Sequence, residues 1–124
     1  MNNKGQTLVI FVLLLPLFIL LFACVIDASI LFYEEHKLNN INQMVIEYKM
    51  YHIEANEEKV EEYIKKNDQD VHIEKITMDD EKVEIFLSKE VKSLFGQIIG
   101  LKHYDIQSSY RGLIDKKEIQ KIEE

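Results

Sequence analysis

The feature that most constrains this sequence is an unbroken apolar block near its N-terminus. The nineteen residues Leu8–Ile26 contain no charged side chain, and sixteen of them are Leu, Ile, Val or Phe. A helix rises 1.5 Å per residue, so about 20 such residues cross a hydrocarbon core of about 30 Å. The sixteen side chains favour insertion into a bilayer by roughly 5–10 kcal/mol. The block therefore predicts a transmembrane helix, which we place at residues 6–33 because apolar residues continue past Asp27.

Single residues inside and beside the block predict its shape and orientation. Pro16 is the only proline of the chain, and it should kink the helix because it removes one backbone hydrogen bond. Asp27 follows the block directly, where we expect an interfacial carboxylate, which costs less than one at the bilayer centre. Lys4 precedes the span, whereas Glu34 and Glu35 follow it. The positive-inside rule therefore places the N-terminus in the cytoplasm and the rest of the chain outside.

The charged residues are concentrated beyond the apolar block. Hydrophobic residues make up 47% of the chain, yet its mean hydropathy is only −0.15. Residues 34–124 contain 21 acidic and 14 basic side chains, a net charge of −7. Such an acidic segment argues against nucleic-acid binding, which needs a basic footprint. A single cysteine, Cys24, excludes a disulfide scaffold, and the charge pattern excludes a freely soluble globular protein.

The helical pattern continues outside the predicted membrane segment. No glycine or proline occurs between Pro16 and Gly96, so one helix is expected from about Gln6 to about Tyr51. A packing stripe recurs on this helix at spacings of three and four residues. Its members are Leu38, Ile41, Val45, Tyr48 and His52. We expect the stripe to hold the chain's own sheet, with a contact between subunits as the alternative, and we expect His52 to be a packed side chain.

The rest of the chain alternates between helical and extended patterns. Asn56 is the expected N-cap of a second helix that closes at Asn67. Alternation in residues 71–78 and 83–87 predicts a β-hairpin with a bulge near Glu74–Lys75 and a turn at residues 79–81. Residues 91–99 predict a short helix stopped by Gly100, and residues 104–110 predict a third strand.

These elements predict an α+β fold in four segments. Residues 1–5 are a short leader or cytoplasmic flank, and residues 6–33 form the transmembrane helix. Residues 34–114 form an extracytoplasmic domain, in which a three-stranded antiparallel sheet packs on the outer half of the long helix. Residues 115–124 are mostly charged and are expected to fray as a tail.

The sequence offers no recognisable catalytic or ligand-binding motif. None of the four histidines pairs with a second histidine or a cysteine at metal-ligand spacing. The serines lack a nucleophile-elbow context, and the four glycines form no phosphate-binding loop. We therefore expect no enzymatic activity, no cofactor, no bound metal and no small-molecule substrate.

The N-terminal motifs resemble those of a known family of pilus-assembly proteins. The sequence Lys4-Gly5-Gln6-Thr7-Leu8-Val9 opens into the span and is followed by Leu15-Pro16, Val25-Ile26-Asp27 and Leu31-Phe32-Tyr33. These motifs resemble the TadE/TadG-like family, which includes minor pseudopilins of the tight-adherence (Flp) type IV pilus. The resemblance implies a structural protein of a bacterial cytoplasmic membrane, in cell adhesion. Its implied partners are other pilins or pseudopilins and the pilus-assembly platform.

The resemblance also implies a processing site with one departure from the family pattern. A prepilin peptidase would cut between Gly5 and Gln6, although Lys4 and Gly5 are also an ordinary polar flank. Classical type IV pilins carry glutamate at the fifth residue of the mature chain, where this sequence has Ile10. The departure fits a TadG-like protein, a tip or priming subunit, or an unprocessed membrane component better than a repeating filament subunit.

A second mode of anchoring is a lipid attached to Cys24. The sequence Leu21-Phe22-Ala23-Cys24 resembles a lipobox and would make the chain a bacterial lipoprotein. The alternative function is thus that of a lipoprotein or a bitopic envelope binding module anchored at or near Cys24. Two features count against it: Phe22 is bulky where such sites carry a small residue, and apolar residues continue after Cys24.

Overall fold

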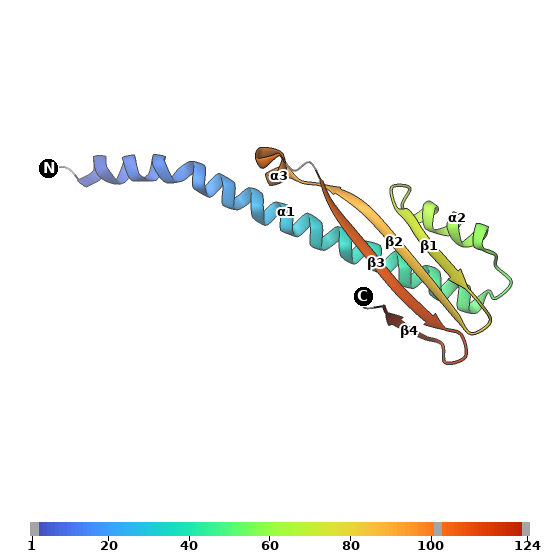
Figure 1. Cartoon of the computed structure of the whole chain (residues 1–124). Helices are drawn as coiled ribbons and strands as arrows, with labels where there is room; N and C mark the ends of the chain where they lie inside the picture. Colours follow the sequence, from blue (N-terminus) through green and yellow to red (C-terminus); the bar gives the residue numbers. More distant parts are fainter. Residues whose placement is uncertain (1–2, 101–102, 123–124) are drawn as a thin grey trace.

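The computed structural model describes residues 3–100 and 103–122 and has an α+β architecture, as predicted. The elements run in the order α1 (Asn3–Tyr51), α2 (Glu57–Asn67), β1 (His72–Met78), β2 (Lys82–Lys92), α3 (Leu94–Ile99), β3 (His103–Leu113) and β4 (Glu118–Lys121). Figure 1 shows that α1 extends far beyond a head formed by the sheet, α2 and the outer half of α1 itself.

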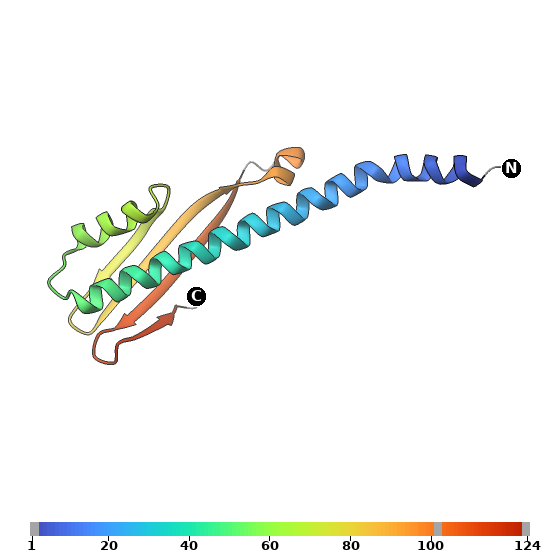
Figure 2. The same ribbon diagram turned by 180° about the vertical axis from the view of Figure 1, so that it is seen from behind.

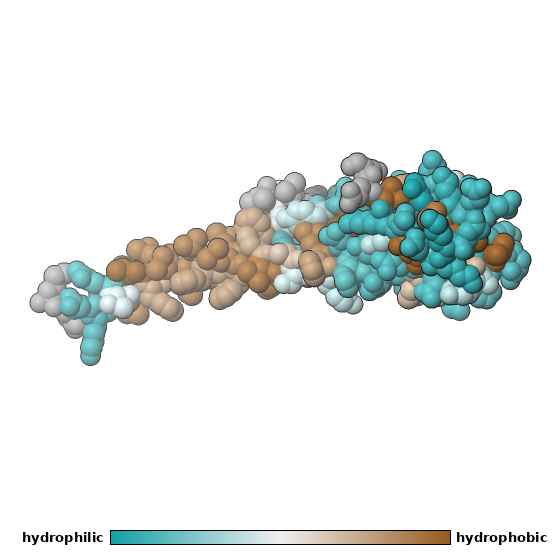
Figure 3. Space-filling view, turned by 90° about the horizontal axis from the view of Figure 1, so that it is seen from below, coloured by the Kyte–Doolittle hydropathy of each residue, from teal (hydrophilic) through white to brown (hydrophobic). Residues whose placement is uncertain are grey.

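Helix α1 is one continuous helix of 49 residues, about 74 Å long at 1.5 Å per residue. It continues through Pro16, and Figures 1 and 2 show it bending within its blue N-terminal third. Among the residues described, it is the one helix long and apolar enough to cross a membrane, and the mean hydropathy over its apolar stretch of 18 residues is 3.3. Figure 3 shows the resulting division between an apolar shaft and a largely hydrophilic head. The shaft is the exposed N-terminal part of α1, up to Ile26.

The sheet is antiparallel with the strand order β1-β2-β3-β4. Helix α1 packs against β2 and β3, and α2 lies beside α1 and β1 (Figures 1 and 2). The sheet has four strands, whereas three were expected, because β4 forms within the segment predicted to fray. Strand β4 pairs with β3 from Leu113↔Glu118 to Tyr110↔Lys121, and Ile119 packs against the core. One apolar residue among charged neighbours was too weak a pattern to predict this strand.

Most local signals in the head are confirmed, but the helix expected at residues 91–99 begins only at Leu94, because Val91 and Lys92 pair with β3 as the end of β2. The β1–β2 register shifts between Ile73 and Lys75, at the expected bulge. In the turn, Asp79 Oδ1 accepts hydrogen bonds from the Glu81 and Lys82 amides, both at 2.8 Å. The side chain of Asn56 caps α2 by accepting from the Lys59 amide. Gly100 ends α3 at φ 94°, a left-handed conformation that favours glycine.

The core lies between α1 and the inner face of the sheet. Alternate residues of β2 face it, together with residues of β3, α2 and the outer half of α1. The fully buried large side chains include Leu38, Val45, Ile46, Val60, Ile64, Val71, Val83, Ile85 and Leu87. Gly112 of β3 lies directly under α1, and a Cβ atom there would sit 2.2 Å from Ile46 Cγ2. The missing side chain therefore sets how closely the helix approaches the sheet.

A buried amide links α1 to both central strands. Asn42 is fully buried, and its Nδ2 donates to Ile85 O at 3.0 Å, to Ser108 O at 3.1 Å and to Ser108 Oγ at 3.2 Å. These partners lie on β2 and β3. Because a buried amide is costly unless it is paired, Asn42 favours one register of the helix over the sheet.

Candidate functional site

The apolar shaft and the head meet at Asp27. This residue is only 6% exposed, although Val25 and Ile26 just before it are 62% and 46% exposed. Its carboxylate turns toward the head and accepts three hydrogen bonds from the start of α3. Oδ2 accepts from Ser93 Oγ and from the Phe95 amide, both at 2.7 Å, and Oδ1 accepts from the Leu94 amide at 2.6 Å. We call Asp27 and these three partners the junction.

The junction satisfies backbone groups that a helix cannot satisfy by itself. The first amides of any helix lack an intrahelical partner. Ser93 caps α3 by accepting from the Gly96 amide at 2.6 Å, and Asp27 accepts from the Leu94 and Phe95 amides. Charge-assisted bonds of this kind are stronger than neutral ones. A carboxylate on α1 therefore completes the cap of α3, which lies 66 to 68 residues further along the chain.

A second polar link lies about two turns further along α1, at Glu34. Lys89 of β2 donates to Glu34 Oε2 at 2.7 Å and to Asp68 Oδ2 at 2.6 Å. The side chains of Lys89, Glu34 and Asp68 are 11%, 21% and 8% exposed. Burial raises the pKa of Asp68, but the Lys89 hydrogen bond, the Asp70 amide and the charges of Lys89 and Lys37 together lower it below its ordinary value. This ion-pair cluster joins α1, β2 and the segment after α2.

The packing stripe divides along its length. Leu38, Ile41 and Val45 are buried in the core, and Tyr48 is half-buried. His52 differs from the expectation of a packed side chain: α1 ends at Tyr51, and His52 is exposed just beyond it. Its ring stacks on Tyr48 with centroids 4.4 Å apart, and its Nδ1 lies 3.0 Å from Tyr48 O. Helix termination therefore takes His52 off the buried face.

The other residues of the predicted membrane motif lie on the exposed part of α1. Lys4, Gly5, Gln6, Leu15 and Pro16 are all exposed and helical. An added Cβ at Gly5 would meet nothing within 4 Å. The proposed cleavage position is therefore accessible and does not take part in packing the head.

Beyond Asp27, α1 also presents exposed aromatic residues at the end of the span predicted at residues 6–33. Phe32 and Tyr33 are 74% and 64% exposed, and the Phe32 and His36 rings stack with centroids 6.4 Å apart. Cys24 is exposed within the same uninterrupted helix.

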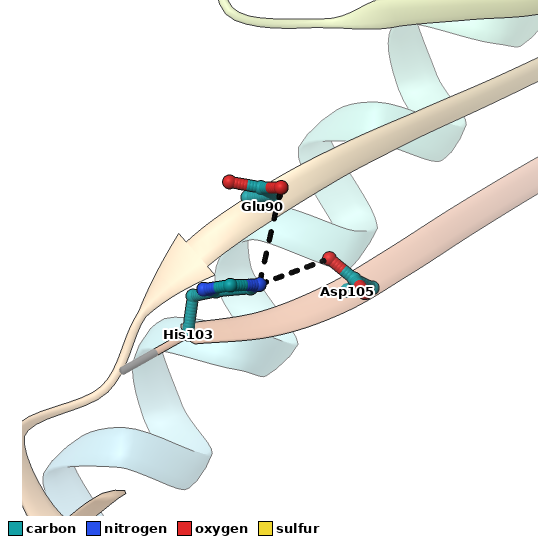
Figure 4. A group of neighbouring side chains, drawn as sticks. All are labelled: Glu90, His103 and Asp105. Carbon is teal, nitrogen blue, oxygen red and sulfur yellow. Dashed lines mark ion pairs between the residues drawn. The ribbon is translucent and has the colours of Figure 1, made fainter. Parts of the chain in front are cut away.

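One group of potential metal-binding side chains was not predicted from the sequence. Glu90 of β2 and His103 and Asp105 of β3 gather on one exposed face of the sheet (Figure 4). His103 Nε2 lies 3.9 Å from Glu90 Oε1 and 3.8 Å from Asp105 Oδ1. Strand pairing creates the group, because Glu90 lies opposite Asp105. Its three side chains are 47% to 70% exposed, which is typical of a solvated ion pair.

The comparisons with known proteins bear on the N-terminal part of the chain. The family model described as TadE-like protein matches residues 5–41. That range includes Gly5, the whole apolar block, Asp27 and the first residues of the packing stripe. No curated protein and no solved structure matches the chain. The apolar helix and the family match together fit a membrane-anchored protein, and the segment 5–41 of this chain is TadE-like.

Proposed function

We propose that this chain is a membrane-anchored, non-catalytic structural component of a tight-adherence (Flp) type IV pilus, acting as a minor pseudopilin or assembly factor. The observation that carries the proposal is that the TadE-like segment, residues 5–41, lies within one unbroken helix that continues into the core of the head. The same helix is thus both the anchor and the scaffold of the folded domain.

The proposed location is a bacterial cytoplasmic membrane, crossed once, with the N-terminus in the cytoplasm and the head outside. Support comes from the exposed apolar surface of Leu8–Ile26 and from Lys4 on its N-terminal side. The head is largely hydrophilic on the face in Figure 3. The proposed partners are other pilins or pseudopilins and the assembly platform.

The proposed processing step is removal of residues 1–5 by a prepilin peptidase. Gly5 is exposed, and the space around it is open, which supports approach by a protease. Ile10 leaves the mature N-terminal amine without the glutamate of classical pilins. An unpaired amine inside an apolar filament is costly. We therefore place the chain at a tip, at a priming complex or in the membrane, and not as a repeating subunit of the filament.

The proposal is tested by the intact mass of the protein purified from membranes of its native host. Loss of residues 1–5 would support entry into the pilin pathway despite Ile10. A full-length mass would support an unprocessed anchored component and refute incorporation as a filament subunit. A mass that begins at Cys24 and includes acyl chains would replace the pilin account with a lipoprotein.

A matched pair of variants sharpens this measurement. Gly5→Leu adds a bulky side chain at an open position, so it should block cleavage and leave the head folded. Cys24→Ser removes the one cysteine of the chain and should leave the mass unchanged apart from the substitution itself. Association with the pilus is then tested by probing sheared filaments and membranes separately for the chain. Absence of the protein from both filament and assembly-platform complexes would refute a pilus role.

A further inference from the structure

We propose that α3 is a membrane-contacting foot of the head, which lies against the lipid surface of the leaflet on the head's side. The proposal rests on the anchoring of α1 given above and adds a second point of contact between the protein and the bilayer. The occupant of this surface is lipid, at the level of the headgroups and the first part of the acyl chains.

The junction fixes the position of α3 relative to the membrane. Asp27 follows the apolar block Leu8–Ile26 directly, so its carboxylate marks the end of that block, six residues before the end of the span predicted at residues 6–33. The Leu94 and Phe95 amides lie 2.6 and 2.7 Å from that carboxylate. Helix α3 therefore starts at the level of the last two turns of that span, where the bilayer interface is expected. In Figures 1 and 2, α3 lies beside α1 and is the element of the head nearest to the exposed shaft.

The composition of this segment differs from that of the rest of the head. The nine residues between Lys92 and Lys102 are uncharged in a head whose net charge is −7. Leu94 is 52% exposed, and Lys92 beside it is exposed as well. A short apolar segment between basic residues is typical of chains that lie in a bilayer interface, where apolar side chains enter by about 5–10 Å. A lysine beside such a surface, as Lys92 is here, is attracted to anionic lipid.

Continuity with the shaft identifies lipid as the occupant. Val25 and Ile26 are exposed apolar residues at the same level of α1, so lipid that covers them reaches the level at which α3 begins. An exposed leucine on this side of the head thus faces the boundary of the same apolar phase. On the opposite end of the head, Ile53 is equally apolar and 62% exposed, but it lies beyond the C-terminal end of α1 and far from the shaft.

The absence of tryptophan from the sequence makes a clean fluorescence test available. Three single-tryptophan variants of the full chain, Leu94→Trp, Ile53→Trp and Phe18→Trp, are placed in nanodiscs that contain anionic lipid. Leu94 and Ile53 are a matched pair of exposed apolar positions, at 52% and 62%, and Phe18 reports the span. Quenching is measured with phosphatidylcholine brominated either near the carboxyl end or near the methyl end of its acyl chains.

We expect lipid brominated near the carboxyl end to lower the Leu94→Trp emission by about twofold, since an interfacial side chain lies at that depth. Phe18→Trp should be quenched by lipid brominated near the methyl end, and Ile53→Trp by neither. If Phe18→Trp is quenched while Leu94→Trp behaves like Ile53→Trp, the foot is refuted and the anchor stands. If Phe18→Trp is not quenched, the anchoring itself fails and the foot fails with it.

Discussion

Replacing Asp27 with alanine should release α3 from α1 and leave the core of the head intact. The substitution removes the acceptor of three short hydrogen bonds, from Ser93 Oγ and from the Leu94 and Phe95 amides. The buried core residues begin further along α1, at Leu38. We therefore expect a local opening of residues 93–100 and no global unfolding.

The size of the effect follows from the number and kind of bonds. A hydrogen bond to a charged group contributes about 1.5–3 kcal/mol, and the loss of a helix cap costs about 1 kcal/mol. The three bonds share one carboxylate and their donors can turn to water, so their contributions do not add fully. We expect the local opening free energy to fall by about 2–4 kcal/mol. At 1.36 kcal/mol per tenfold change, this corresponds to roughly 30- to 1,000-fold faster amide exchange.

The assay is hydrogen exchange of the full chain in micelles, resolved at the Leu94 and Phe95 amides. Asp27→Asn keeps one carbonyl oxygen and should give an intermediate rate, while Asp80→Ala, an exposed residue of the β1–β2 turn, should change nothing at α3. Unchanged exchange of both amides in Asp27→Ala would refute the stabilising role of the junction. Equal acceleration throughout the sheet would instead show that Asp27 supports the whole head.

Three further predictions concern the head. Gly112→Ala should lower the free energy of unfolding by about 2–3 kcal/mol, because its Cβ would sit 2.2 Å from Ile46 Cγ2; urea unfolding measures this, and a smaller loss is expected in an Ile46→Ala background. Lys89→Met should lower the free energy of unfolding by about 2–3 kcal/mol, because Glu34 and Asp68 lose their cation. Lys66→Met, at an exposed lysine, is the control. Equal stability of the two variants would contradict a stabilising role for the ion-pair cluster. The lowered pKa of Asp68 means that its contribution is fully present above about pH 4 and is lost as the pH falls through the folded value. Unfolding at a series of pH values should show this acid loss, and Lys89→Met should reduce it; a profile that Lys89→Met leaves unchanged would count against the ion-pair cluster.

The features predicted from the sequence are those with local causes. The span follows from one composition run, the cap of α2 from Asn56, and the end of α3 from Gly100. The bulge follows from a change of phase within residues 71–78. Each of these signals lies within a few residues of the structure it produces.

The features that the sequence did not predict depend on distant pairing. Asp27 was expected at an interface, but its partners lie 66 to 68 residues away, and no local pattern connects Asp27 with Ser93. The group of Glu90, His103 and Asp105 exists only once the β2–β3 register is known. Strand β4 depends on β3 as a template and on one packed residue, Ile119. These features are tertiary, so no period or spacing in the sequence encodes them.

The unbroken course of α1 has a mechanical consequence. Traction applied to the head enters α1 at the core and passes along its backbone hydrogen bonds into the shaft, with no glycine or proline between Pro16 and Tyr51 to act as a hinge. The junction and the Lys89 ion-pair cluster tie α1 to the head at two further points. A force that pulls on the head would therefore draw the shaft with it, and the first position at which α1 could bend would be Pro16, in the middle of the apolar block.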